Sequence, residues 1–402
     1  MYLRHLSLTN FRAYARLELE LPAGPILIHG DNAQGKTSLL EAVYYLATAK
    51  SPHTSSDRQL IHWLAGEEGL TPYARLVGDV SRTDRAARIE MTLLLERANT
   101  ADGYRFRKQI RVSGGAIRAA DLAGQMNVVL FLPQDVDTVG DSPGERRRYL
   151  DNVLSQIDPD YIRAIDRYAD VLAQRNALLK QLQETGGDPD QLAYWDDQLV
   201  ADGVAITLKR ALALEALSRS ADRIHRDLTG GHADLRLRYQ PALDATRSPT
   251  AEYQMVLRLD VPAAVADPRR AEAAFHAQLE ERRSEEIEAG MTLVGPHRDD
   301  FRFISDQIDL GTYGSRGQQR SAILALKLAE VEWIKDKAGD WPILLLDEVL
   351  AELDIRRRAY LLARLDRVSQ ALMTTADPTL FSKEFRSRAR MLHVTAGRIE
   401  EG

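Results

Sequence analysis

Apolar and polar residues alternate over the first 30 positions, and this period of two predicts paired strands with one buried face. Three apolar residues at 26–28 then lead into Gly30. Over 36–49 the apolar residues recur at helical spacing instead, and strand patterns return at 73–80, 87–96 and 104–112. The first part of the chain is therefore predicted to be mixed α/β, with one strand that runs into a helix through a glycine-containing loop.

Two long helical patterns fill the chain from 159 to about 228, and a turn at 185–189 that contains glycine and proline separates them. At about 1.5 Å of rise per residue, these helices would be roughly 35–60 Å long. Two such helices joined by a short turn predict an antiparallel hairpin. A strand pair at 235–239 and 253–259, and a helix over 268–289, are expected to follow.

The last 110 residues return to the α/β pattern, with an apolar strand at 343–346 and another at 371–375. We therefore predict an α/β fold in which a mainly helical lobe interrupts a nucleotide-binding domain. The predicted boundaries are 1–150 for the first part of that domain, 151–289 for the inserted lobe and 290–402 for the second part.

The segment 30–37 matches the phosphate-binding pattern G-x-x-x-x-G-K-[ST] between a predicted strand and a predicted helix. Its glycines let consecutive backbone N–H groups point at phosphate oxygens, and the helix N-terminus adds partial positive charge. Lys36 is expected to reach the outer phosphates, and the Thr37 hydroxyl to bind Mg²⁺. The predicted nucleotide-binding residues of this loop are Gly30, Asp31, Asn32, Ala33, Gln34, Gly35, Lys36, Thr37 and Ser38.

The other half of such a site is predicted where the apolar strand at 343–346 ends. Asp347 would hold Mg²⁺, and Glu348 would polarise the attacking water as a catalytic residue. Asp347 follows Lys36 by 347 − 36 = 311 positions, which is too far for a compact GTPase or kinase core. This separation also predicts a large insertion within one nucleotide fold.

Ser315 lies between two glycines at the start of a further predicted helix, and this arrangement is a second candidate anion site. One chain would then carry two helix N-termini suited to phosphate. The simplest explanation is that the second one serves a nucleotide held by another copy, so that ATP is sandwiched between two copies. Ser315, Gly317 and Gln318 are the residues predicted to make this contact.

The amino-acid composition excludes several kinds of binding site and catalysis. The chain has 53 Lys and Arg against 59 Asp and Glu, and the net charge of −6 argues against a uniformly basic nucleic-acid coat while allowing a local basic face. The chain has no Cys, which excludes disulfides, thiolate catalysis and Cys-ligated zinc or iron–sulfur sites. Since no apolar run approaches the ~18 residues of a membrane span and no signal-peptide pattern is present, we expect a cytoplasmic protein.

Several motifs together resemble the ABC-type ATPase heads of SMC-like DNA-repair proteins. They are 10–14 after the first strand, the loop 30–37, the segment around Ser315, 346–348 and 351–354. Two further segments, 142–151 and 292–300, are similar to motifs of the RecF family, and the resemblance extends from the first strand to the last.

The resemblance implies an ABC-ATPase head of the P-loop NTPase class with a short helical insertion, and ATP with Mg²⁺ as cofactors. It places Gln134 at the Q-loop position, as a catalytic residue that senses Mg²⁺, and Asp354 at the D-loop position that faces the other copy. Transporter ATPases carry a histidine at the switch position, where this chain has Thr374 and Thr375, so that a threonine is the expected γ-phosphate contact.

The resemblance also implies a function, an ATP-dependent DNA-binding protein of recombinational repair and replication. RecF-like proteins bind single-strand gaps next to duplex DNA, form an ATP-dependent homodimer, and help load the RecA recombinase together with RecR and RecO. Weak DNA-dependent ATP hydrolysis would release the DNA. Two alternative classes are a transporter ATPase subunit, which would need a histidine after Thr375, and a structural SMC-like tether, which would need far longer heptad repeats.

The segment 104–112 carries the DNA-binding candidates. If it is a strand, Arg105, Arg107 and Arg111 share one face, and Lys108 points to the other face with the apolar residues. A face of arginines suits contact with the phosphate backbone, although a merely solvated face is the alternative. The predicted DNA-binding residues are Arg105, Arg107, Lys108 and Arg111.

Two polar clusters are interpreted as internal. The arginines at 146–148 are expected to link the nucleotide state to the inserted lobe. His297 lies beside Arg298 and two aspartates, which suggests a metal or acid–base site, but one histidine and two carboxylates without helical spacing are a weak pattern. We favour a structural or nucleotide-coupling loop there.

Overall fold

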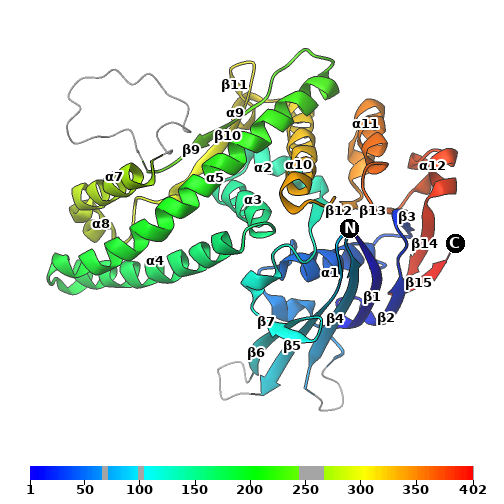
Figure 1. Cartoon of the computed structure of the whole chain (residues 1–402), viewed down its shortest axis with the longest axis horizontal. Coiled ribbons are helices and arrows are strands. Elements are labelled where there is room, and N and C mark those ends of the chain that lie inside the picture. The colour runs from blue at the N-terminus through cyan, green and yellow to red at the C-terminus, as the bar shows by residue number, and fades with distance from the viewer. Residues whose placement is uncertain (66–70, 98–103, 244–266, 402) are drawn as a thin grey trace. The chain divides into compact units, whose positions relative to one another are not determined.

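The computed structural model describes residues 1–65, 71–97, 104–243 and 267–401. These residues form two compact units, which we call the head unit (Met1–Asp135 with Glu330–Gly402) and the arm unit (Val136–Ala329), and Figure 1 shows their elements. The boundaries differ from the predicted ones at 150 and 289. The helices α2 (Asp137–Gly140) and α3 (Pro143–Ser155) pack within the arm unit, and the strands at 300–305 and 308–309 pair there too. None of the described helices is long and apolar enough to cross a bilayer.

The first sheet of the head unit is entirely antiparallel, in the order β2-β1-β4-β5-β6-β7. Leucines on one face of its first strand, such as Leu6 and Leu8, are fully buried, which confirms the predicted period of two. The strands are β1 (Tyr2–Phe11), β2 (Tyr14–Glu20), β4 (Tyr73–Ser81), β5 (Ala86–Arg97), β6 (Tyr104–Val112) and β7 (Gly115–Ile117).

The second sheet of the head unit has the order β15-β14-β3-β13-β12-β8, and all its strands except β15 are parallel. The carboxyl ends of its strands therefore meet at one edge, where ligands bind in such sheets. The strands are β3 (Gly24–His29), β8 (Val128–Phe131), β12 (Ile343–Asp347), β13 (Gln370–Thr375), β14 (Arg390–Thr395) and β15 (Arg398–Glu401).

Helix α1 (Lys36–Thr48) contacts strands of both head sheets and is buried along most of its length. The buried Gln370 also joins the sheets, because its side-chain amide exchanges two 2.9 Å hydrogen bonds with the backbone N–H and carbonyl of Leu3. Helices α11 (Ile355–Leu365) and α12 (Lys383–Arg388) follow β12 and precede β14, respectively.

The arm unit contains the predicted helical hairpin. Helices α4 (Pro159–Thr185) and α5 (Leu192–Thr229) have 27 and 38 residues, roughly 40 and 57 Å at the α-helical rise. Ion pairs tie the two helices together, as with Asp158 at the N-terminus of α4 and Lys209 in the middle of α5, at 2.6 Å. The predicted single helix over 268–289 is instead two helices, α7 (Pro268–Glu281) and α8 (Arg283–Ala289), because the backbone leaves the helical conformation at Arg282.

A three-stranded antiparallel sheet completes the arm unit, in the order β11-β10-β9. Its strands are β9 (Arg236–Gln240), β10 (Asp300–Ser305) and β11 (Ile308–Asp309). The strand predicted at 253–259 lies outside the described residues. Helix α9 (Leu310–Tyr313) follows this sheet and leads to α10 (Arg316–Ala338).

Buried ion pairs connect the elements of the arm unit. The fully buried Arg146 donates to both carboxylate oxygens of Asp300, at 2.6 and 3.0 Å. Arg210 of α5 pairs with Asp151 at 2.8 Å and with Asp299 at 3.2 Å. The segments 142–151 and 292–300 therefore meet in one network, and buried charges of this kind require full pairing.

His297 takes part in the packing of this network. Tyr168 donates its hydroxyl to Nδ1 at 2.7 Å, and Nε2 lies 3.1 Å from the carbonyl oxygen of Thr292, which fixes the neutral tautomer. Burial lowers the pKa of His297 to about 4. Both ring nitrogens are thus engaged within the arm unit, as in a packed neutral histidine.

This environment predicts a pH dependence of stability. Between pH 6.5 and about 4 the unfolded state binds a proton at His297 that the folded state does not bind. The contribution of this site to the free energy of unfolding is therefore fully present above pH 6.5. It decreases as the pH falls from 6.5 to about 4, by at most about 1.4 kcal/mol per pH unit. Thermal unfolding of the chain and of His297→Gln between pH 4 and 7 measures it, and the variant should show a shallower slope. Equal slopes would contradict the prediction.

Candidate nucleotide-binding site

The phosphate-binding loop joins β3 to α1 and adopts a conformation that depends on its glycines. Gly30 and Gly35 have φ of 149° and 113°, and a Cβ atom on Gly30 would lie 2.3 Å from the carbonyl oxygen of Val394. Ala33 between them also has positive φ, at 63°. A loop built in this way turns backbone N–H groups toward one centre, which is the geometry that phosphate binding needs.

Lys36 is held at the centre of this loop. Its side chain is only 4% exposed, and the ammonium donates to the carbonyl oxygens of Gly30 at 2.8 Å and Asp31 at 2.9 Å. Glu348 lies 3.2 Å from the same ammonium. The loop and the end of β12 thus meet through one cation, as the sequence predicted from two segments 311 positions apart.

Thr37 and Asp347 form the candidate metal-binding pair. The Thr37 hydroxyl lies 2.9 and 3.1 Å from the two carboxylate oxygens of Asp347. A hydroxyl and a carboxylate are the hard oxygen ligands that Mg²⁺ prefers, and Mg²⁺ usually takes its other ligands from phosphate and water. The residues present therefore fit Mg²⁺.

Thr374 orients both acidic residues at the end of β12. Its hydroxyl donates to Asp347 at 2.6 Å and accepts the backbone N–H of Glu348 at 3.0 Å. Sequence reasoning expected a threonine here to contact a γ-phosphate and missed this positioning role. The parallel register of β12 and β13, which sets Asp347 opposite Thr374, explains it.

Glu348 follows the strand in a left-handed conformation, with φ of 52°. This conformation is uncommon for a residue with a side chain, and it persists only when the surroundings impose it. Its side chain is 38% exposed and stands beside Lys36. The strand end therefore presents a carboxylate to solvent next to the phosphate loop, as a water-polarising group requires.

Two turns of the head unit support the loop from outside. Tyr14, beyond the first β-turn, donates its hydroxyl to the Gly35 carbonyl at 3.0 Å. The turn between β14 and β15 donates two backbone N–H groups to Gln34, from Ala396 at 2.6 Å and Gly397 at 3.0 Å. These contacts were not predicted, since nothing local in the sequence signals them.

Gln134 lies just beyond β8, which pairs in parallel with β12, so that it follows the same sheet edge as Asp347. Its side chain is exposed. This placement agrees with a Q-loop position, and its role in catalysis and metal sensing stays a prediction.

Ser315 belongs to the arm unit, where it caps α10. Its hydroxyl accepts the backbone N–H of Gln318 at 3.3 Å, and the Gln318 side chain accepts the Ser315 N–H at 2.8 Å, which is a capping box. Ser315, Gly317 and Gln318 are all exposed. Asp354 of the head unit caps α11 in a similar way, and the backbone N–H of Arg357 lowers its pKa.

The basic strand β6 has the predicted two faces. Arg105, Arg107 and Arg111 are exposed, and the Arg107 guanidinium lies 3.5 Å from Glu96. Lys108 points to the other side, where its ammonium is 2.8 Å from both Asp57 and the Ala49 carbonyl oxygen. Lys108 is thus engaged by the head unit itself, and we do not retain it among the DNA-binding candidates.

These features define a P-loop ATPase head of the ABC and SMC class. The RecF/RecN/SMC N-terminal domain family matches residues 2–400. The chain is 43% identical to a DNA replication and repair protein RecF of Herpetosiphon aurantiacus over 99% of both chains, and 42% identical to that of Chloroflexus aurantiacus over 100% of both. The chain belongs to the RecF family.

Comparison with solved structures also finds similarity to RecF. A structure described as the recombination mediator protein RecF–ATP in the RecFOR pathway superposes with a TM-score of 0.83 and 28% identity, covering 100% of this chain and 97% of the other. An SMC head bound to the C-terminal winged-helix domain of ScpA superposes with a TM-score of 0.52 and 16% identity over 100% of this chain and 96% of the other, which shows the shared fold.

Proposed function

We propose that the chain binds ATP with Mg²⁺ at the head unit and uses slow hydrolysis as a switch in DNA replication and repair. The observation that carries this proposal is the convergence of Lys36, Thr37, Asp347 and Glu348 at one sheet edge. The RecF–ATP structure supports it, because that protein is similar over its whole length.

The residues divide the chemistry between them. The ammonium of Lys36 and the N–H groups of the loop hold phosphate oxygens and neutralise their charge. Thr37 and Asp347 would hold Mg²⁺, which supplies electrostatic stabilisation of the transferred phosphoryl group. Glu348 orients the attacking water and accepts its proton, while Thr374 keeps Glu348 and Asp347 in place.

We further propose that ATP binding closes a homodimer in which Ser315, Gly317 and Gln318 contact the nucleotide of the other copy, with Asp354 at the interface. The exposed N-terminus of the 23-residue helix α10, with its capping box, supports this role. DNA would be held by the arginine face of β6, at single-strand gaps beside duplex. In this scheme the protein acts in the cytoplasm with RecR and RecO and helps load RecA, and DNA stimulates its weak ATPase activity.

The phosphate loop is tested by Lys36→Ala. This change removes the buried cation of the loop, and we expect ATP affinity to fall by at least about 100-fold, since charged hydrogen bonds to phosphate contribute about 1.5–3 kcal/mol each. Isothermal titration calorimetry with ATP measures the loss. Tight ATP binding by a folded Lys36→Ala protein would contradict the assignment.

Glu348→Gln separates binding from hydrolysis. The amide cannot accept a proton, whereas Asp347 and Thr37 remain, so that ATP binding should persist while hydrolysis falls by about 100-fold or more. Phosphate release measures hydrolysis, and retention on DNA with ATP should increase. Glu20→Gln is a matched control, because it removes an exposed carboxylate of β2 outside the site. Normal ATP hydrolysis by Glu348→Gln would mean that another residue polarises the water, and Gln134 would be the next candidate.

The sandwich arrangement is tested at Ser315. Ser315→Arg should leave ATP binding by the monomer nearly intact but abolish ATP-driven dimerisation and hydrolysis, because a bulky cation replaces the small capping hydroxyl. When the Ser315→Arg and Lys36→Met proteins are mixed, a heterodimer has two nucleotide sites, each built from both chains. One site carries both substitutions and the other carries neither. The intact site should restore part of the ATP-dependent dimerisation, which analytical ultracentrifugation measures. Loss of monomer ATP binding as severe as in Lys36→Ala would place both residues in one site of one chain.

The DNA face is tested by Arg105→Glu with Arg107→Glu. Binding should weaken for all DNA sequences, and the slope of log affinity against log salt should fall by about two, without a change in ATP affinity. Fluorescence anisotropy over a salt series measures both quantities. Arg97→Glu, on the neighbouring strand, is a comparison variant. An unchanged salt slope would mean that this face is merely solvated.

A further inference from the structure

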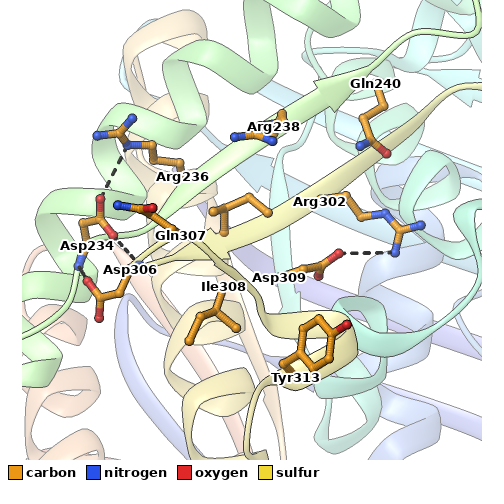
Figure 2. A pocket seen from close by; sticks show the side chains of 11 residues that line it. Asp234, Arg236, Arg238, Gln240, Arg302, Asp306, Gln307, Ile308, Asp309 and Tyr313 are labelled. Atoms are coloured by element: carbon orange, nitrogen blue, oxygen red, sulfur yellow. Dashed lines mark hydrogen bonds and ion pairs between the residues drawn. The ribbon is translucent and has the colours of Figure 1, made fainter. Parts of the chain in front are cut away.

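Within the part of the chain that the structure describes, the small sheet of the arm unit is covered on one face only. Side chains such as Leu237, Tyr239, Phe301 and Phe303 are buried on the covered face, against α3 and α5. The opposite face forms an open groove of about 1260 Å³, shown in Figure 2. Antiparallel sheets often leave one face to water, but such a face is then usually polar throughout.

Of the three arginines that line the groove, Arg238 is the one without an ion-pair partner among the described residues. Arg238 and Arg302 are directly opposite in the register of β9 and β10, an arrangement of like charges that destabilises a sheet. Arg302 is compensated by Asp300 at 3.0 Å and Asp309 at 3.8 Å. Among the described residues no carboxylate lies within ion-pair distance of Arg238, and Figure 2 shows it standing over the groove.

Apolar side chains also line the groove. Ile304 of β10 lines the groove, Ile308 of β11 is 45% exposed and Tyr313 of α9 is 78% exposed. A groove that combines an exposed aromatic ring, branched aliphatic side chains and a guanidinium is typical of a surface that binds a partner.

The rim of the groove is fixed before any partner arrives. Asp306 and Gln307 form the tight turn between β10 and β11 with φ of 47° and 68°, and the Asp306 N–H donates to Asp234 at 2.7 Å. Positive φ at both central residues is the conformation of a hairpin turn that matches strand twist. A preformed groove of this kind loses little conformational entropy on binding.

We propose that this groove binds an acidic peptide segment of a partner protein. A carboxylate of the peptide pairs with Arg238, and an adjacent apolar side chain packs on Ile308 and Tyr313. Nucleic acid is disfavoured, because three carboxylates, those of Asp234, Asp306 and Asp309, line the groove together with three arginines and leave no net positive charge for a polyanion. A short peptide, unlike a polyanion, can place one carboxylate at Arg238 and its apolar side chains on the rest of the groove.

The test measures fluorescence anisotropy of a labelled synthetic peptide with three aspartates followed by phenylalanine and leucine, added to the full-length chain. Saturable binding is expected. Peptides with lysines in place of the aspartates, or serines in place of the two apolar residues, should bind at least about tenfold more weakly.

Arg238→Glu is the decisive variant. It puts a carboxylate opposite Arg302, where a cross-strand ion pair should keep the sheet folded, yet it should weaken peptide binding at least about tenfold. Tyr313→Ser should also weaken binding. Arg219→Glu is the matched control, since Arg219 is an exposed arginine of α5 that does not line the groove, and it should bind like the unmodified chain.

Any one of three results would overturn the proposal. The first is that the peptide does not bind to the unmodified chain, and the second is that Arg238→Glu binds the peptide as tightly as the unmodified chain does. The third is that labelled single-stranded DNA binds to the groove instead and that Arg238→Glu removes this DNA binding. Calorimetry with ATP on the same variants separates this proposal from the proposed nucleotide function, because the groove variants should bind ATP normally.

Discussion

The carboxylate of Asp347 is the group on which the nucleotide site depends. It accepts from Thr37 at the start of α1 and from Thr374 at the end of β13, and it stands next to the residue that faces Lys36. These contacts bring together segments from both ends of the chain and set the distance between the phosphate loop and the water-polarising carboxylate. Replacing this one side chain would leave two hydroxyls without their common acceptor at the junction of the two halves of the site.

The elements of the arm unit are held together by a different kind of interaction. Its elements are joined by buried arginines, each paired with more than one acceptor, as Arg175 is with Asp196, Glu286 and Thr292. Buried ion pairs add little net stability, but a misplaced partner is costly, so that they favour one arrangement of helices and strands over others. The hairpin α4–α5 is therefore fixed in register against the sheet as well as packed against it.

Much of this architecture could be predicted from the sequence. The alternation along β1, the apolar runs of β3 and β12 and the helical hairpin were all apparent, because each depends on local periodicity. The site halves were found because the phosphate loop and the acidic strand end have local signatures. Thr374, Tyr14 and the turn at Ala396 escaped prediction, since their roles arise from strand register and from contacts between distant segments. The unit boundaries differed for the same reason, because β9 pairs with a strand some 60 positions later.

The position of β3 in its sheet has a consequence for the order in which the protein folds. Its neighbours β13 and β14, and the turn that holds Gln34, all follow β3 by roughly 350 positions in the chain. All six strands of the antiparallel sheet lie within residues 2–117, so that this sheet can pair early in synthesis. The parallel sheet can form only after residues 370–395 have been made. A nascent chain therefore carries its phosphate loop for a long time without the strands that shape it, and the ability to bind nucleotide is acquired late.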